Sequence, residues 1–473
     1  MTTMLSVADW YRPFHAFVQG DTTKTILSFV VVIGILILVH ELGHFLVARW
    51  MGVGVERFSI GFGPVLLRWR GKDTEYCLSA IPMGGYVKMM GEESPLEGGG
   101  TATVDPAKSF SLKPLAARFL IVFAGPGMNF VLAAAIFAAV FMIVGRPVLP
   151  STIGRVKAGG PAAQAGLRAG DRVTAVDGVP ATNWEDLLSA IQASGGETRQ
   201  IAFSRDGREQ RVALTPAMTK VRDIFGDERE VWDIGAGPFA PARIGEIQPG
   251  YPAAKVGLRP GDVVVAVDGN AVISWDEMAE AIHKRAGRPM ALTIEREGRS
   301  LSVSVVPQAF KERGPTGEEV EIGRIGIGPA AVSYVRSNPI QAVWKGGART
   351  WDMTVLTARG LWKLVTRQLP ASMIGGPVEI ARQAGEQAKQ GLMSLAFFTA
   401  VISVNLGLLN LLPVPILDGG HLFFFVIEWI LGRPLSLRKR EVAQQVGLFL
   451  LLLLMVFAVY NDLTRIDFLR FFR

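Results

Sequence analysis

The sequence predicts a polytopic α-helical membrane protein with about four transmembrane helices and two inserted α+β units. Composition is the first support: 49% of the 473 residues are hydrophobic and the mean hydropathy is +0.31, while 19% are charged. These values indicate membrane segments that carry soluble domains. The second support is a set of four stretches that are apolar and long enough to span a bilayer. The third is a segment in the middle that occurs twice.

The chain begins with an N-terminal extension, residues 1–24, of mixed polarity that includes Trp10, Arg12 and Asp21. No small-residue cleavage pattern follows the first apolar run, so we expect the first span to be retained as a signal anchor.

The first predicted span, residues 25–50, contains the sequence His40-Glu41-Leu42-Gly43-His44. Residues four apart share one face of a helix, so His40 and His44 can direct two imidazoles at one metal ion. Glu41 is then placed to take a proton from water. The alternatives are a chance match or a packed histidine pair. With only five histidines in the chain, and because ionisable groups are costly inside a membrane, we favour the metal site.

Residues 51–114 are expected to form a β-hairpin followed by a loop. Gly61-Phe62-Gly63-Pro64 opens a β-like run, and residues 81–88 end it. An edge strand can hold an extended chain, and glycine allows a second backbone to approach closely. The alternative is an ordinary hairpin at the membrane interface.

The second predicted span, residues 115–145, is interrupted by Gly125-Pro126-Gly127-Met128-Asn129. A break there would open space beside the metal. Because glycine and proline are also common in ordinary membrane helices, we assign this interruption no catalytic role.

Residues 161–191 and 252–282 are the same sequence twice, with about half of the positions identical at an offset of 91. Each copy contains a Gly-Leu-Arg-x-Gly-Asp turn, a strand rich in valine and alanine, an Asp-Gly turn and an amphipathic helix. The two helices are expected at about 184–193 and 275–285. Such self-similarity indicates duplicated modules.

This pattern resembles tandem PDZ domains of the circularly permuted bacterial type, over residues 150–240 and 241–335. PDZ domains bind extended peptides by strand addition in a groove between a strand and a helix. The glycine-rich segments 234–237 and 325–328 would border the two grooves. The alternative is that the domains are spacers or size filters with empty grooves.

The net charge of +7 and the pI near 9.5 could suggest nucleic acid, but the charge distribution argues against it. Between Ser151 and Val335 there are 22 Lys+Arg and 24 Asp+Glu, so the soluble middle is slightly acidic. The excess lies beside membrane segments, notably in the loop 433–440. By the positive-inside rule this loop is cytoplasmic, and 150–335 and both termini lie outside, although the stretch 340–367 is also basic. Cys77 is the only cysteine, which excludes an intrachain disulfide.

Residues 338–391 are expected to form an amphipathic interfacial helix region. Trp344, Trp351 and Trp362 recur at helical spacing together with lysine and arginine residues. Aromatic rings at headgroup level and cations near phosphates are typical of such a helix, which could gate access to the site.

The third predicted segment, residues 392–430, supplies the remaining ligand that a metal with an open position requires. Asp418 lies in an otherwise apolar stretch, where an unpaired carboxylate is expensive, and Pro413 and Pro415 break the helix before it. There are two alternatives: His421 is the ligand in place of Asp418, or Asp418 caps the helix that follows the prolines. We favour Asp418 as the ligand. A fourth transmembrane helix is expected at 443–461.

These features together resemble the site-2 protease family of intramembrane zinc metalloproteases, over nearly the whole chain. The shared elements are HExxH in the first span, the tandem PDZ pattern and Asn-x-x-Pro-x-Pro-x-Leu-Asp-Gly, which begins at Asn410. The resemblance implies a membrane-reentrant β-hairpin with Gly84, Gly85 and Tyr86 at its substrate-facing edge. It also implies a role for each motif residue. By it, His40, His44 and Asp418 ligate zinc, Glu41 is the general base and later the proton donor, and Asn410 contacts the substrate backbone.

The resemblance also implies regulated intramembrane proteolysis in the bacterial inner membrane, in the branch of the family that acts in the sigma-E stress response. The substrates would be single-span membrane proteins, such as an anti-sigma factor, and remnant signal peptides. The PDZ domains would be periplasmic and act as a substrate filter or gate, with the active site toward the cytoplasmic side. A catalytically silent PDZ scaffold and a metal transporter are the alternatives. A buried Glu41 argues against the scaffold, and the absence of further polar sites along the spans argues against the transporter.

Overall fold

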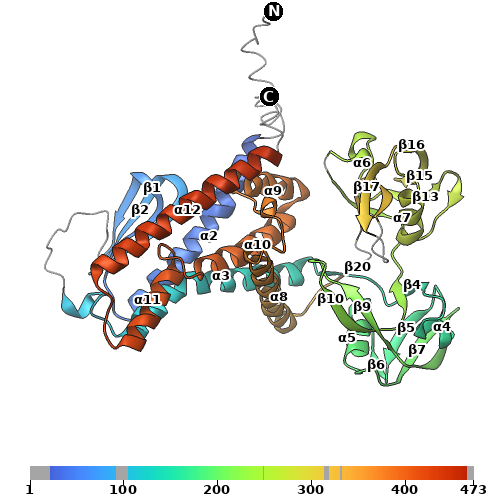
Figure 1. Cartoon of the computed structure of the whole chain (residues 1–473), viewed down its shortest axis with the longest axis horizontal. Coiled ribbons are helices and arrows are strands. Elements are labelled where there is room, and N and C mark those ends of the chain that lie inside the picture. The colour runs from blue at the N-terminus through green and yellow to red at the C-terminus, as the bar shows by residue number, and fades with distance from the viewer. Residues whose placement is uncertain (1–21, 92–104, 249, 314–318, 331–332, 466–473) are drawn as a thin grey trace, which may run out of the picture. The chain divides into compact units, whose positions relative to one another are not determined.

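The computed structural model describes residues 22–91, 105–248, 250–313, 319–330 and 333–465 (Figure 1). The chain forms two compact units. Residues 1–144 and 337–473 make up the first, which we call the membrane unit, and residues 145–336 make up the second, the inserted unit. Most of the predicted N-terminal extension, residues 1–24, lies outside the described residues.

The membrane unit is built mainly from helices. Among the described residues, four are long and apolar enough to cross a membrane: α2 (Thr22–Trp50), α3 (Leu115–Ile143), α10 (Leu392–Asn410) and α12 (Leu437–Arg465). The described residues thus contain four candidate membrane-spanning helices, the number that the sequence predicts. The other helical elements are η1 (Pro106–Lys108), α8 (Pro339–Val365), η2 (Ala371–Met373), α9 (Pro377–Gln390) and α11 (Asp418–Leu431).

Helix α3 is central to the membrane unit and contacts α2, α8, α10 and α11. Glycine on three of these neighbours allows the close approach. A Cβ atom at Gly43 of α2 would overlap the carbonyl oxygen of Ala124, and one at Gly346 of α8 would lie 2.6 Å from that of Ala134. At Gly407 of α10 it would lie 3.1 Å from the carbonyl oxygen of Pro126. Small residues are what lets membrane helices pack backbone to backbone.

Two predicted segments each form two helices. Region 338–391 contains α8, which packs along α3 through buried Ala342, Gly346 and Thr350, and then α9. Region 392–430 contains α10 and α11, separated by residues 411–417. The two prolines in this stretch explain the break, because proline cannot donate a backbone hydrogen bond to a helix.

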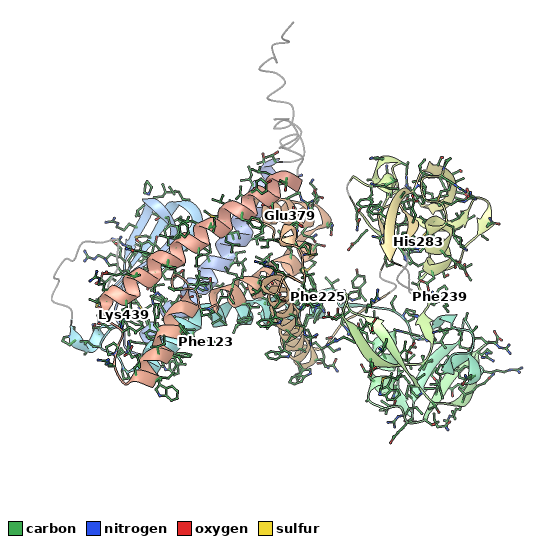
Figure 2. All side chains as sticks on the ribbon, in the orientation of Figure 1. Phe123, Phe225, Phe239, His283, Glu379 and Lys439 are labelled. Carbon is green, nitrogen blue, oxygen red and sulfur yellow. The ribbon has the colours of Figure 1, made fainter. Side chains whose placement is uncertain are left out.

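Helix α12 is attached to its neighbours near its two ends. Asp462, which is buried, accepts hydrogen bonds from the backbone amides of Gly376, Val378 and Glu379 at 2.8, 3.0 and 3.1 Å, at the start of α9. Glu379 is labelled in Figure 2. Near the other end of α12, a Cβ at Gly447 would lie 3.1 Å from Pro415. Along the middle of α12 the apolar side chains are exposed, as expected for a face that contacts lipid.

The hairpin of β1 (Val55–Arg70) and β2 (Glu75–Met89) doubles back on itself, because Arg57 pairs with both Lys88 and Glu75. The paired segments therefore run in the order 65–70, 75–79, 55–60 and 85–89. The hairpin packs on α2, where Phe45 of the helix meets Phe58 at 5.2 Å between ring centroids.

The inserted unit contains two repeats of one β-rich fold, so the predicted PDZ-like regions are present. In the first repeat a sheet has the order β6-β5-β7-β8, and in the second the order is β14-β13-β15-β16. The first sheet and its helices are β5 (Arg172–Val176), β6 (Val179–Pro180), β7 (Arg199–Arg205), β8 (Arg208–Leu214), α4 (Pro161–Gln164) and α5 (Trp184–Gln192). Their counterparts are β13 (Val263–Val267), β14 (Asn270–Ala271), β15 (Met290–Arg296), β16 (Arg299–Val305), α6 (Pro252–Lys255) and α7 (Trp275–His283).

Each repeat also has two small antiparallel sheets, and a further pair joins the ends of the unit. The small sheets of the first repeat are formed by β4 (Ile153–Val156) with β11 (Ala236–Pro238) and β9 (Ala217–Arg222) with β10 (Glu228–Asp233). Those of the second are β12 (Ile244–Ile247) with β19 (Ile327–Pro329) and β17 (Gln308–Arg313) with β18 (Glu319–Arg324). β3 (Arg146–Val148) pairs with β20 (Ser333–Val335), so the insertion begins and ends in one two-stranded stalk.

A buried ion pair occurs at the same place in both repeats. Asp171 accepts hydrogen bonds from Arg205 at 2.6 and 2.7 Å, and Asp262 does the same with Arg296. Burial alone would raise the pKa of each carboxyl, but the arginine and a backbone amide outweigh it, so both pKa values lie below the ordinary range.

Candidate metal centre

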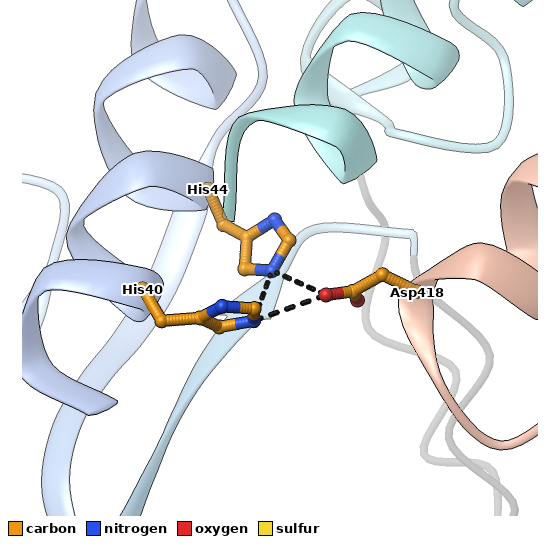
Figure 3. A group of neighbouring side chains, drawn as sticks. All are labelled: His40, His44 and Asp418. Carbon is orange, nitrogen blue, oxygen red and sulfur yellow. Dashed lines mark hydrogen bonds and ion pairs between the residues drawn. The ribbon is translucent and has the colours of Figure 1, made fainter. Parts of the chain in front are cut away.

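Three side chains from two distant segments meet inside the membrane unit (Figure 3). His40 and His44 lie one turn apart on α2, and Asp418 is the first residue of α11. The two Nε2 atoms are 3.2 Å apart. Asp418 Oδ2 lies 3.0 Å from Nε2 of His40 and 3.5 Å from Nε2 of His44. Both histidines are buried, each 8% exposed, and the side chain of Asp418 is 21% exposed.

This geometry fits a tetrahedral zinc site. With ligand bonds of about 2.0–2.1 Å, neighbouring ligand atoms of a tetrahedron lie about 3.3 Å apart, and the three observed separations bracket that value. Among the described residues, His40, His44 and Asp418 form the group of potential ligands with all three atoms within 4.8 Å. Three protein ligands leave a fourth position for water or substrate, as in catalytic zinc sites.

Asp418 is free to face the imidazoles because its side chain does not cap α11. The two glycines that follow it allow the preceding turn to fold over the helix start. A Cβ at Gly419 would overlap the backbone of Leu411 and Leu412, and one at Gly420 would overlap that of Val414. The rival His421 lies outside the cluster, and its ring packs edge-on against Phe424 at 6.4 Å.

The second ring nitrogens of the two histidines have different partners. His44 Nδ1 lies 2.9 Å from the carbonyl oxygen of Ile121, which can only accept a hydrogen bond. His40 Nδ1 lies 3.2 Å from Nδ2 of Asn129 and 3.5 Å from Nδ2 of Asn410. Asn410 is thus placed beside the cluster, at the end of α10.

The predicted interruption of the second span is wrong, because α3 is continuous from Leu115 to Ile143 with Pro126 inside it. The segment 125–129, to which we assigned no catalytic role, instead lies in the wall of this site. A Cβ at Gly125 would overlap the ring of His44 and lie 2.9 Å from Nε2 of His40, so only glycine leaves room for both imidazoles. Asn129, one turn further on, contacts His40 and is fully buried. The sequence signal was visible as a glycine, a proline and an asparagine within five residues of a membrane helix, but its meaning depends on how α3 packs on α2.

Glu41 is half-buried, directly after His40 in the sequence, and the outer segment 85–89 of the hairpin lies beside it. A Cβ at Gly85 would lie 3.2 Å from Cγ of Glu41. The Tyr86 hydroxyl accepts a hydrogen bond from Arg57 at 3.1 Å. A Cβ at Gly84 would overlap the ring of Phe62, which itself stacks on Tyr86. The three predicted edge residues therefore lie together, and Gly85 lies beside Glu41.

Comparison with known proteins gives matches along nearly the entire chain. The profile of Peptidase family M50 matches residues 28–454. The chain is 37% identical over 459 residues to Protease RseP of Yersinia pestis, covering 93% of this chain and 99% of that protein. It is 37% identical over 456 residues to Regulator of sigma-E protease RseP of Escherichia coli, covering 93% and 98%. A Neisseria meningitidis protein named as a zinc metalloprotease is 36% identical over 458 residues, covering 93% and 99%.

Proposed function

The chain belongs to peptidase family M50, the site-2 protease family, and on that premise we propose that it cleaves membrane-spanning segments of single-span proteins. The predicted family membership is confirmed, and so is the prediction of a zinc metalloprotease of the site-2 type. The observation that supports an intramembrane active site is the cluster of two imidazoles and a carboxylate, 3.0–3.5 Å apart, next to Glu41 in an apolar helix.

We assign His40, His44 and Asp418 as the residues that hold zinc. Bound there, zinc supplies a Lewis acid that activates water near neutral pH and polarises a carbonyl group. The opposite charges of an ion and a carboxylate also explain how Asp418 is accommodated beside two imidazoles in an apolar setting.

Glu41 acts as general base and then as general acid. Its carboxylate takes a proton from the attacking water and delivers it to the leaving amine nitrogen after the peptide bond breaks. This role is supported by the position of Glu41 directly after His40 on α2 and by its Cγ, which would lie 3.2 Å from a Cβ at Gly85 of β2.

The substrate is held as an added strand on the outer segment of β2, at Gly84, Gly85 and Tyr86. A transmembrane helix satisfies its own amides, so it must unwind before a peptide carbonyl is accessible, and an edge strand offers replacement hydrogen bonds. The proximity of Gly85 to Glu41 supports this placement, and Asn410 is positioned to contact the same backbone. The exposed Leu66, Leu67 and Trp69 on the opposite side of the hairpin suit a segment that re-enters the bilayer.

The inserted unit contains two PDZ domains, 150–240 and 241–335, which act as a substrate filter or gate. The second repeat has a groove of about 290 Å³ between α7 and the segment 323–327, lined by Met278, Ile282 and His283 among others (Figure 2). In the first repeat, the residue equivalent to His283 is Gln192, and its side chain bonds both the carbonyl oxygen and the amide of Trp232. These bonds engage the backbone groups that an added strand would need there. We therefore place peptide recognition in the second repeat.

The substrates are single-span proteins such as an anti-sigma factor, and remnant signal peptides. Two of the relatives are named for sigma-E regulation or for RseP, which supports this choice. The chain resides in a bacterial inner membrane, with the basic loop 433–440 in the cytoplasm and the inserted unit in the periplasm. A catalytically silent PDZ scaffold is not favoured, because it would not require a complete ligand set beside Glu41.

The test is cleavage of a tagged single-span peptide by the purified protein in detergent. Wild type, Glu41→Gln and wild type with a zinc chelator are compared side by side. Cutting by untreated wild type alone is the expected result. Equal cutting in all three samples would remove both zinc and Glu41 from the mechanism, and a protein that binds no zinc would favour the scaffold.

A further inference from the structure

His40 requires a hydrogen-bond acceptor at Nδ1 if its Nε2 is to bind a metal. A neutral imidazole carries one hydrogen, and a nitrogen that ligates a metal must be the one without it. His44 meets this condition through the carbonyl oxygen of Ile121, 2.9 Å from Nδ1. At His40 the groups near Nδ1 are two side-chain amides, those of Asn129 and Asn410.

The two amides are not equivalent. Asn129 is fully buried, and its Nδ2 lies 3.2 Å from His40 Nδ1, whereas Asn410 is only half-buried and lies at 3.5 Å. Asn129 Oδ1 is buried without a hydrogen-bond partner. Oxygen and nitrogen of an amide are assigned by their hydrogen bonds and not by shape. A half-turn of this amide places Oδ1 against Nδ1–H of His40 and gives the oxygen a donor.

The backbone of Asn129 is held in place from the other side. Ser403 of α10, itself fully buried, donates a hydrogen bond of 2.7 Å to the Asn129 carbonyl oxygen. Gly125, one turn earlier on α3, packs against the two imidazoles. The amide therefore approaches His40 from a position fixed by three helices, which suits a group that orients a ligand.

We propose that Asn129 is a positioning residue whose Oδ1 accepts a hydrogen bond from Nδ1–H of His40 and so keeps Nε2 available to zinc. This assignment leaves the more exposed Asn410 to contact substrate. It rests on the proposed function, because it assumes that His40 is a zinc ligand. Partners that orient a metal-binding histidine typically contribute about 10–100-fold in metal affinity.

The experiment measures Zn²⁺ affinity of the full-length protein in detergent by competition with a chromophoric chelator. Asn129→Leu, which removes the acceptor, is expected to weaken Zn²⁺ binding by about 10–100-fold. Asn129→Asp keeps an oxygen and has no donor, so it should stay within about threefold of wild type. Asn410→Leu should also retain Zn²⁺ affinity and instead raise KM for peptide cleavage.

Two outcomes would overturn the proposal. One is wild-type Zn²⁺ affinity in Asn129→Leu. The other is an equal loss in Asn129→Asp and Asn129→Leu, which would mean that the amide acts through Nδ2 or only through packing. Thermal unfolding of each variant without zinc distinguishes a loss of folding from a loss of metal binding. If Asn129→Leu proves unstable, the Zn²⁺ affinity of Asn129→Asp tests the proposal. A wild-type protein that binds no Zn²⁺ would refute the proposed function instead.

Discussion

At position 125, the absence of a side chain decides whether two imidazoles fit. Gly125→Ala would place a methyl group on the ring of His44 and next to His40. Overpacking of this kind costs about 1–3 kcal/mol, so we expect Zn²⁺ affinity to fall by about tenfold or more. The measurement is chelator competition on the purified variant.

The matched control is Gly127→Ala, two residues along the same helix. A Cβ there would lie 3.6 Å from the Phe123 ring, an ordinary contact. Alanine is the better helix former by about 0.8–1 kcal/mol, so this variant should bind Zn²⁺ normally and be no less stable than wild type. Equal Zn²⁺ affinities in the two alanine variants would contradict the assignment of Gly125 to the wall of the site.

The catalytic role of Glu41 can be tested without changing the size of its side chain or the zinc ligands. Glu41→Gln keeps the size of the side chain and leaves His40, His44 and Asp418 intact, so zinc content should remain at the wild-type level. Without a carboxylate to move the proton, cleavage should drop by at least about 10²–10⁴-fold. Metal analysis and peptide cleavage on the same preparation check this. Retained turnover would remove Glu41 from the mechanism.

At this scale the sequence predicted the residues whose chemistry is unusual for their surroundings. Two histidines four apart and an aspartate in apolar segments are costly without a metal, so the sequence alone identifies them as candidate ligands. The roles of Gly125 and Asn129 could not be predicted in this way, because they depend on which atoms of α2 and α10 lie opposite them. The sequence alone does not distinguish a glycine that leaves room for a neighbouring ring from a glycine that only ends a helix.

Among the elements, α12 is joined to the start of α9 through Asp462, and its neighbour Asn461 donates hydrogen bonds to the carbonyl oxygens of Ala371 and Ile374 just before α9. Asp462 accepts three backbone hydrogen bonds at the start of α9, as a cap does. Asp462→Ala should destabilise this junction by about 1–2 kcal/mol, measured as faster amide exchange at 376–379. Asp462→Asn keeps one acceptor oxygen and should be intermediate. Unchanged exchange in the alanine variant would show that the Asp462 carboxylate does not stabilise this junction.

The main sheets of the inserted repeats should lose stability as the pH falls. The pKa of Asp171 is lowered in the folded state from an ordinary value of about 3.9. Its contribution to stability is therefore complete above about pH 4 and is lost as the pH falls through the lower, folded-state pKa. Asp171→Asn should lose this pH dependence and about 1–3 kcal/mol at neutral pH, since a charged hydrogen bond is removed.

Hydrogen exchange of the segment 199–214 in the full-length protein, corrected for intrinsic rates, follows this change. Asp206→Asn, at an exposed turn next to Arg205, is the control and should behave like wild type. An acid response that persists unchanged in Asp171→Asn would assign it to other carboxylates.

Element boundaries show which sequence signals are strong. The amphipathic helices of the repeats were predicted at 184–193 and 275–285, and the structure has them at Trp184–Gln192 and Trp275–His283. Periodic apolar residues and polar caps define such helices locally. The doubled hairpin was not predicted, because pairing of Arg57 with two different segments is a long-range contact with no local period.

For the whole molecule, the filter role of the inserted unit can be tested by deleting most of that unit while keeping the strand pair at its base. Val148 and Ser333 are paired in the stalk, so residues 149–332 can be replaced by an Asn-Gly turn. We expect the shortened protein to cleave a substrate with a long outer domain and one with a short outer domain equally well. Wild type should prefer the short one.

Cleavage rates of the two substrates, which share one transmembrane segment, provide the measurement. Adding Glu41→Gln to the shortened protein verifies that the cutting is its own. If deletion leaves the preference of wild type unchanged, the inserted unit is not a filter.

Domain organisation was the part most accessible from sequence. The duplication at an offset of 91 and the four apolar stretches are visible over tens of residues, and single substitutions do not obscure them. The packing of helices around α3 was not accessible, since nearly all of their residues are apolar and periodicity says little about which face meets which neighbour.

That packing has a consequence for how the protein can vary. The atom nearest to a Cβ at Gly43 or Gly346 is a main-chain carbonyl oxygen of α3, 2.3 and 2.6 Å away, and every amino acid carries one. No replacement at the opposing position can make space, so a larger residue at either glycine has no suppressor across the contact. In a library of active variants these glycines should be invariant without covarying with any partner.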